Sequence, residues 1–203
     1  MPAGGGRWRL PPADAAGATM LELIVVLAAA GVLAGVAAPL TASAIDAGRA
    51  RSAAEFVAAR LRLARQQAVA GSASVALVFD VVDGRETFRV CADGNGNGIR
   101  RADVQGGADR CSEGPYDVEA LFPGVEIAVD ASLRGPDGEA GSPDAVRFGR
   151  SNIASFSPAG TCTAGSVFLR SRNGLQVVVR VAGVTGRTRI LWYDPPTRTW
   201  RDA

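Results

Sequence analysis

The 203-residue sequence contains no histidine. Histidine is the side chain most often used as a general base near neutral pH, and it is also the commonest protein ligand of metals. Without it, neither a Ser-His-Asp triad nor a Cys-His pair can form. We therefore expect a protein that is not an enzyme and that requires no cofactor.

Lysine is also absent, so all 22 basic side chains are arginine, set against 20 carboxylates. The formal net charge of +2 is too small to imply a polyanionic partner by itself. Apolar residues make up 47% of a chain of this length, which predicts one globular domain of ordinary size in addition to an apolar anchor.

Cysteine is scarce, with Cys91, Cys111 and Cys162 as its only occurrences. All three follow the apolar segment described next, and an exported domain would favour a disulfide. An odd number leaves one thiol free or paired between chains. We predict a bond between Cys91 and Cys111, because these two cysteines bracket a loop.

Charge is missing from one long stretch, Leu23 to Ile45. As a helix of about 23 residues it would span roughly 35 Å, enough for the hydrocarbon core of a bilayer. Glu22 stands directly before it. The preceding residues 1–16 carry Arg7 and Arg9, which favour retention of this leader in the cytoplasm.

Three interpretations of this region compete. A secretory signal peptide would be cut after the Ala42-Ser43-Ala44 site, and a plain single-span anchor would not be cut. A leader removed after Gly17 would leave the apolar helix attached to the domain. We favour the third interpretation, because it alone gives Gly17 and Glu22 a role.

The segment Gly17-Ala18-Thr19-Met20-Leu21-Glu22 resembles the prepilin peptidase site of type IV pilins and type II secretion pseudopilins. The resemblance implies cleavage between Gly17 and Ala18, N-methylation of Ala18, and a role for Glu22 in filament assembly. Ala18 departs from the family pattern, which usually has phenylalanine or methionine there. The resemblance also implies a bacterial inner-membrane protein with a single membrane span and a periplasmic C-terminal domain.

The position of Glu22 is consistent with that assembly role. A lone carboxylate at the membrane edge is costly unless it is paired, and the new amino group of Ala18 on a neighbouring subunit could pair with it. The alternative is that Glu22 lies in the headgroup region. Gly31 and Gly35 permit close helix approach, and Pro39 should kink or loosen the helix.

Apolar residues continue at helical spacing after the membrane segment, in a stripe with Phe56 and Leu63 beside it. The members of the stripe are Ala53, Val57, Leu61, Ala64 and Ala68. Gly71 is a plausible stop, so we expect one helix over residues 18–70 with residues 23–45 in the membrane. The stripe requires a sheet to cover it.

Strand-like segments dominate the remaining residues 71–203, with hairpin signals at Asp83-Gly84 and Asn173-Gly174. They are Val75–Val81, Thr87–Ala92, Val125–Val129, Val146–Phe148, Ile153–Ser157, Val167–Ser171, Leu175–Val181 and Arg187–Tyr193. No helical pattern of useful length follows Ala70. We predict an α+β, pilin-like fold in which the long helix packs on a mainly antiparallel sheet.

The order and spacing of several further segments resemble the GspH/FimT group of minor pseudopilins and pilins. They are Leu61–Val69 with Val75–Leu77, Phe156–Gly160, Val167–Leu169, Val177–Val181 and Gly186–Arg189. The resemblance implies a minor pseudopilin in the tip of a type II secretion pseudopilus. Its partners would be other pilin-like subunits, the prepilin peptidase, the inner membrane and a secreted substrate.

An alternative is a FimT-like minor pilin of a type IV pilus that takes part in pilus biogenesis or captures DNA. Arg187 and Arg189 lie on one face of a strand and could grip phosphates. Arg180, Arg198 and Arg201 could extend this surface, and Trp192, Tyr193 and Trp200 could stack on bases. The structural alternative is a solvated strand edge whose aromatic rings pack on the sheet.

Two further segments have polar patterns. Asp93, Asn95 and Asn97 alternate with glycine as in the opening of a calcium loop, but the twelfth position is Val104 and not a glutamate. We favour a surface turn over a metal site here. The polar insertion from Asp130 to Asp144 is predicted to be a mobile loop. The resemblance implies that this region contacts neighbouring subunits or a secretion substrate.

Overall fold

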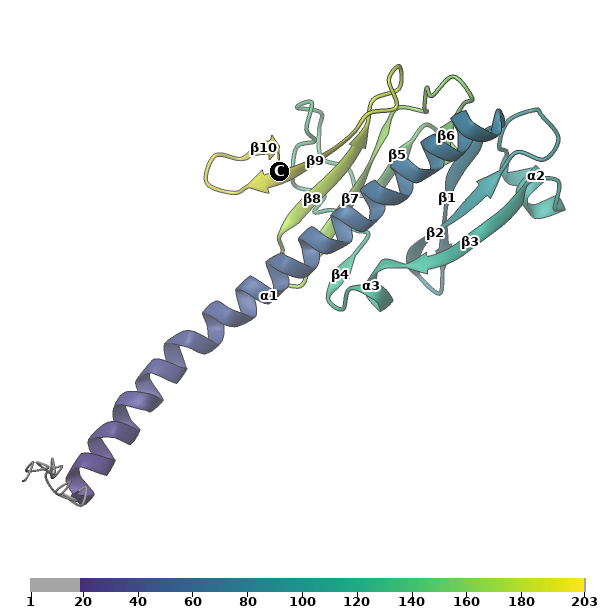
Figure 1. Ribbon diagram of the computed structural model, residues 1–203. Helices are drawn as coiled ribbons and strands as arrows, with labels where there is room; N and C mark the ends of the chain where they lie inside the picture. The colour runs from purple at the N-terminus through teal and green to yellow at the C-terminus, as the bar shows by residue number, and fades with distance from the viewer. Residues whose placement is uncertain (1–18, 203) are drawn as a thin grey trace, which may run out of the picture. The chain divides into compact units, whose positions relative to one another are not determined.

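The computed structural model describes residues 19–202 as one long helix followed by a mostly antiparallel β domain (Figure 1). The helices are α1 (Met20–Gly71), α2 (Arg101–Gly106) and α3 (Val118–Leu121). The first strands are β1 (Val75–Val82), β2 (Arg85–Ala92), β3 (Arg110–Asp117), β4 (Val125–Glu126) and β5 (Val146–Phe148). The later strands are β6 (Ile153–Phe156), β7 (Gly165–Ser171), β8 (Gln176–Val181), β9 (Thr188–Asp194) and β10 (Thr199–Asp202).

The strands form two antiparallel sheets. The first has the order β3-β2-β1-β6, and the second has the order β10-β9-β8-β7-β4, with β5 also pairing with β7. Figure 1 shows β7, β8 and β9 on one side of the C-terminal half of α1 and β1, β2 and β3 on the other. The predicted α+β layout, a long helix against antiparallel sheets, is confirmed at this level.

The C-terminal half of α1 supplies the centre of the core. The expected stripe is completely buried, as are Ala54 and Ala58 beside it. These helix residues belong to one apolar cluster with side chains of both sheets, including Leu77 and Phe88 of the first and Leu169 of the second. Most of the buried helix positions are alanine, so the helix backbone can lie close to both sheets.

Two expected neighbours of the stripe behave differently. Phe56 is partly buried and meets the Tyr116 ring edge-on with ring centroids 5.4 Å apart. Leu63, in contrast, is 38% exposed. Leu63 therefore lies beside the buried stripe, as expected, without belonging to the core.

The hairpin signals lie where they were expected. Asp83 and Gly84 both have positive φ, 51° and 77°, and connect β1 to β2 with Val82 opposite Arg85. This geometry is that of a two-residue hairpin turn. Gly174 has φ 82° and donates its N–H to the Ser171 carbonyl at 2.9 Å in the turn between β7 and β8.

Several elements differ from the expectation. The segment Val125–Val129 pairs only at Val125 and Glu126, and β3, β10, α2 and α3 were not anticipated. β3 contains Gly114 and Pro115 and lies at a sheet edge, where proline costs no ladder bond. α2 and α3 have six and four residues, too few for a helical period.

α1 is helical through Pro39, where a kink or loosening was expected. By contacts, residues up to Thr41 form one unit, and Ala42 onward belong to the unit that contains both sheets. Among the described residues, α1 is long enough and apolar enough to cross a membrane. The N-terminal part of α1 is exposed, since Leu27 is 69% exposed and Leu33 is 71% exposed.

Replacement of Leu61 by alanine should destabilise the β domain by about 2–5 kcal/mol, because it leaves a cavity in the helix-centred core. Leu63→Ala is the matched control, with an expected cost of at most about 1 kcal/mol at its half-exposed position. Urea unfolding of the full chain in detergent, followed by tryptophan fluorescence, measures both. Equal losses would contradict the packing of α1 through the Leu61 face.

Candidate functional site

The described chain begins at the first turn of α1. The Thr19 hydroxyl accepts a hydrogen bond from the Glu22 backbone N–H at 3.2 Å, as an N-cap does. Glu22 lies in the first turn, where the helix dipole favours a carboxylate. Thr19 therefore caps the helix, a local role that sequence reasoning missed. The predicted cleavage residues Gly17 and Ala18 lie outside the described residues.

The small-residue pair of α1 is open to the surroundings. A Cβ placed on Gly31 or Gly35 would meet no atom within 4 Å. Two turns further on, the Thr41 hydroxyl donates to the Ala37 carbonyl at 2.7 Å, which adds a bond near Pro39. The bare surface is therefore available to another helix or to lipid.

The β domain holds α1 directly after the charge-free run. Asp46 accepts hydrogen bonds from the Ser171 hydroxyl and, at 3.4 Å, from the Asn173 backbone N–H. Arg49 donates to the Pro123 carbonyl at 3.2 Å. These bonds connect α1 to the β7–β8 hairpin and to the loop before β4, a role that no sequence pattern marked for Asp46.

A second connection lies near the C-terminal end of α1. Arg65 donates its Nε–H to the Gly160 carbonyl at 3.0 Å. A Cβ on Gly186, whose φ is 60°, would lie 2.5 Å from that same carbonyl oxygen and 2.8 Å from Arg65 Cδ. The glycine of the Gly186-Arg187-Thr188-Arg189 segment is therefore required for close packing.

The arginines that were proposed to bind phosphate are brought together. Arg180, Arg187 and Arg189 line one pocket of about 270 Å³ beside β8 and β9. Arg180 lies directly opposite Arg189 across the two strands, and Arg187 directly precedes β9. Three guanidinium groups therefore share one depression of the surface.

Two of these three arginines already have carboxylate partners. Arg180 pairs through both terminal nitrogens with Asp137, and Arg189 pairs through two nitrogens with Asp202. Within residues 19–202, Arg187 has no carboxylate partner. Arg187 is therefore the guanidinium in this pocket that is free to meet an external anion.

The nearby aromatic residues pack largely on the sheet. Trp200 meets the rings of Phe168 and Tyr193 edge-on, at centroid separations of 5.8 and 5.3 Å. Its indole N–H donates to the Arg134 carbonyl at 2.8 Å. Trp192 is partly buried against the core. This arrangement agrees with the structural alternative for the tryptophans.

The two other arginines that were expected to extend this surface lie around β10. Arg201 pairs with Asp194 at 2.7 Å, so its charge is also compensated. Arg198 is exposed in the turn before β10, with φ 54°. Neither residue lines the pocket of Arg187.

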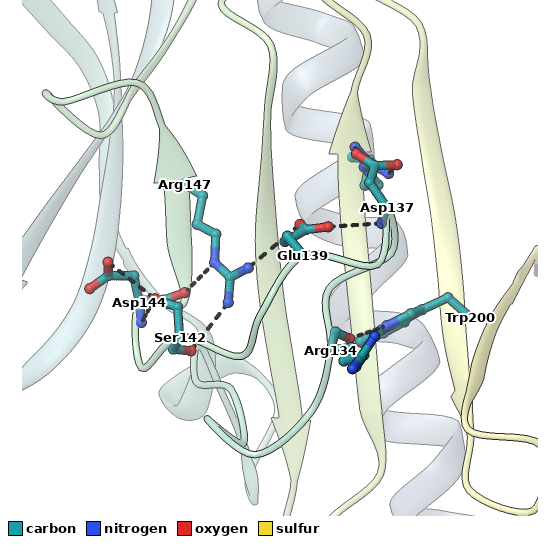
Figure 2. A network of polar contacts seen from close by, with 8 residues as sticks. Arg134, Asp137, Glu139, Ser142, Asp144, Arg147 and Trp200 are labelled. Carbon is teal, nitrogen blue, oxygen red and sulfur yellow. Dashed lines mark hydrogen bonds and ion pairs between the residues drawn. The ribbon is translucent and has the colours of Figure 1, made fainter.

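The insertion from Asp130 to Asp144 is fastened to the second sheet, in contrast to the expected mobile loop (Figure 2). Arg147 of β5 donates to the Asp144 and Ser142 carbonyls at 2.9 and 3.2 Å and lies 3.8 Å from Glu139. Arg147 also lies over the Phe168 ring at 4.3 Å. The sequence did not reveal these bonds, because most of them use backbone carbonyls.

A disulfide joins Cys91 of β2 to Cys111 of β3, which are paired across the first sheet. Cys162 is a free thiol whose pKa is raised to about 12 by burial. It therefore remains protonated at neutral pH. The loop closed by the disulfide contains the segment that resembles a calcium loop.

That loop is held by hydrogen bonds to its own backbone. Asp93 accepts from the N–H groups of Asn95, Gly96 and Gly98. Partial desolvation raises the pKa of Asp93, but these bonds more than offset it and the pKa lies below its ordinary value. Asn95 accepts from the Asn97 N–H at 3.1 Å. Among the described residues, no group of three or more His, Cys, Asp or Glu side chains is placed to hold a metal.

Comparisons with known proteins found no match to a protein-family model, a curated protein or a solved structure.

Replacement of Asp137 by asparagine should loosen the 130–144 insertion around Asp137, while the bonds of Arg147 to Ser142 and Asp144 remain. Its hydrogen bond with Arg180 lowers the pKa of Asp137 below the ordinary value of 3.8. The ion pair therefore stabilises docking above that pH, and the stabilisation is lost as the pH falls through the lowered pKa. The Trp200 indole N–H resonance reports docking by NMR.

We expect D137N at pH 7 to show the Trp200 shift that the wild type shows only in acid. Asp83→Asn, in the β1–β2 turn, is the control and should leave the resonance unchanged. An unchanged resonance in D137N would contradict a role for this ion pair in docking.

Proposed function

We propose that this chain is a membrane-anchored structural subunit of a pilin-like filament, of the GspH/FimT kind. The first candidate is a minor pseudopilin at the tip of a type II secretion pseudopilus. Its partners would be neighbouring subunits, the prepilin peptidase and the inner membrane. The β domain would lie in the periplasm and would contact a secreted substrate.

The proposal rests mainly on one observation, which is that the two halves of α1 have different surroundings. Its N-terminal part exposes large apolar side chains, whereas residues from Ala50 to Ala68 form the centre of the β-domain core. A simple anchor or a signal peptide does not have to continue into the core of the domain that follows it, because that domain folds by itself. A helix common to core and anchor suits a subunit whose domain must be held rigidly on a packed helix.

The beginning of α1 supports an assembly role for Glu22. Its side chain is exposed and has no ion-pair partner within residues 19–202. In a helical bundle, the amino group produced by cleavage after Gly17 on a neighbouring subunit would neutralise it. Such a pair would set the axial register between subunits.

A signal-peptide cut after Ala44 fits the structure less well. Ala42, Ser43 and Ala44 are helical within α1, and Asp46 two residues later is bonded to the β7–β8 hairpin. Cleavage there would create a new helix N-terminus at Ile45, directly before the residue that bonds to this hairpin. We propose that the mature chain retains the whole of α1.

The mature protein extracted from membranes should begin at Ala18, with or without an added methyl group, as determined by intact mass and N-terminal analysis. Glu22→Ala should leave this cleavage and the unfolding midpoint unchanged but abolish site-specific crosslinking between α1 helices of neighbouring subunits. Glu22→Asp is the matched control and should retain part of it. A start at Ile45 would refute the proposal.

The pocket of Arg180, Arg187 and Arg189 supports a second candidate, a FimT-like minor pilin that takes part in type IV pilus biogenesis or DNA uptake. Arg187 is exposed and uncompensated, and two further guanidiniums line the same pocket. Against this, Asp137 and Asp202 neutralise Arg180 and Arg189. DNA phosphates would have to displace these carboxylates, which predicts weak binding.

DNA binding by the full chain in detergent should therefore weaken steeply with salt and depend most on Arg187. We expect R187A to abolish the binding, R189A to weaken it less, and Asp202→Asn to strengthen it by releasing Arg189. Fluorescence anisotropy with a short labelled duplex measures all four proteins. No binding near physiological salt would exclude this candidate and leave the first one unaffected.

A further inference from the structure

A small pocket of the β domain borders α1 where the charge-free run ends. Its volume is about 280 Å³. Ile45, Asp46 and Arg49 line it from α1, and the loops that contain Pro123 and Arg172 line it from the other side. Ile45 is the last residue of the charge-free run, so apolar helix surface meets polar groups at this position.

Two exposed arginines, Arg49 and Arg172, line this pocket. Arg49 makes one hydrogen bond, at 3.2 Å to the Pro123 carbonyl. The side chain of Arg172 lies beside Gly124, where an added Cβ would approach its Nε to 3.4 Å, and it also lines a neighbouring pocket with Glu119 and Glu126. Within residues 19–202, neither arginine has a carboxylate within ion-pair distance.

The carboxylate in the same pocket does not neutralise them by contact. Asp46 is partly buried, and one of its oxygens accepts from both the Ser171 hydroxyl and the Asn173 N–H. It is therefore directed to the β7–β8 hairpin. Arg49 and Arg172 remain available to an anion that enters from outside.

The position of the pocket along the chain indicates which anion it would meet. Arg49 follows Ile45 by four residues, which corresponds to about 6 Å along a helix. If the run to Ile45 spans the bilayer, the hydrocarbon core ends beside this pocket and the headgroup layer begins there. The guanidinium groups would then lie at the depth of the lipid phosphates.

We propose that Arg49 and Arg172 bind the phosphate of an anionic phospholipid in the leaflet next to the β domain. This inference rests on the membrane anchoring proposed above. Planar guanidinium groups bind phosphate through paired hydrogen bonds, and Ile45 supplies an apolar neighbour for the acyl chains. The bound lipid fixes the height of the β domain above the membrane.

The test uses the full chain in detergent, titrated with phosphatidylglycerol or phosphatidylcholine and followed by native mass spectrometry. We expect phosphatidylglycerol to bind more tightly, and Arg172→Ala to weaken its binding about fivefold, the effect of one basic residue near an anionic surface. Arg172→Lys keeps the charge but loses the paired hydrogen bonds, so it should bind more weakly than the wild type and more tightly than Arg172→Ala. Arg150→Ala, an exposed arginine that does not line the pocket, is the control and should change nothing.

Three results would overturn the inference: equal affinity for the two lipids, an R172A variant that binds like the wild type, or full displacement of the lipid by millimolar inorganic phosphate. The last would identify a site for soluble phosphate. Alkaline carbonate extraction of membranes separates this outcome from failure of the proposed function. A chain that resists extraction but shows no lipid preference refutes only the lipid site, whereas an extracted chain refutes the anchor itself.

Discussion

The structure depends on the burial of one helix face between two sheets. From Ala50 to Ala68, α1 provides alanine at most buried positions and larger side chains at Val57 and Leu61. Small side chains allow both sheets to approach the helix backbone, and the larger ones fill the space between them. The apolar faces of both sheets and this face of α1 share one core, so the C-terminal half of α1 belongs to the same compact unit as the sheets.

The ends of this buried helix segment are held by polar contacts of a different kind. Asp46 binds the β7–β8 hairpin at one end, and Arg65 binds the Gly160 carbonyl at the other. Apolar burial is not directional and allows a helix to slide or rotate, whereas hydrogen bonds specify position. The two contacts therefore fix the position of the C-terminal half of α1 within the β domain.

Arginine supplies every basic side chain of this domain, and part of that charge is compensated by carboxylates of the domain itself. Asp80 receives both Arg89 and Arg101, which outweigh its partial burial and hold its pKa below the ordinary value. Asp137 pairs with Arg180, and this bond likewise holds the pKa of Asp137 below its ordinary value. Nine of the 20 arginines within residues 19–202 have a carboxylate within ion-pair distance. The others, Arg187 and Arg172 among them, have none, so uncompensated positive charge is spread over many positions of the domain.

The sequence by itself determined the apolar run, the buried stripe of α1 and most of the strands, because each depends on a local period or on a turn residue such as Gly84. It also singled out Cys91 with Cys111. Only the tertiary structure decided that Leu63 is exposed and that residues 130–144 are bonded to the second sheet. It also decided that Asp137 and Asp202 form ion pairs with Arg180 and Arg189, two of the arginines proposed for the phosphate-binding surface. These features arise from contacts between segments far apart in the chain, many of them to backbone carbonyls, and such contacts leave no local pattern.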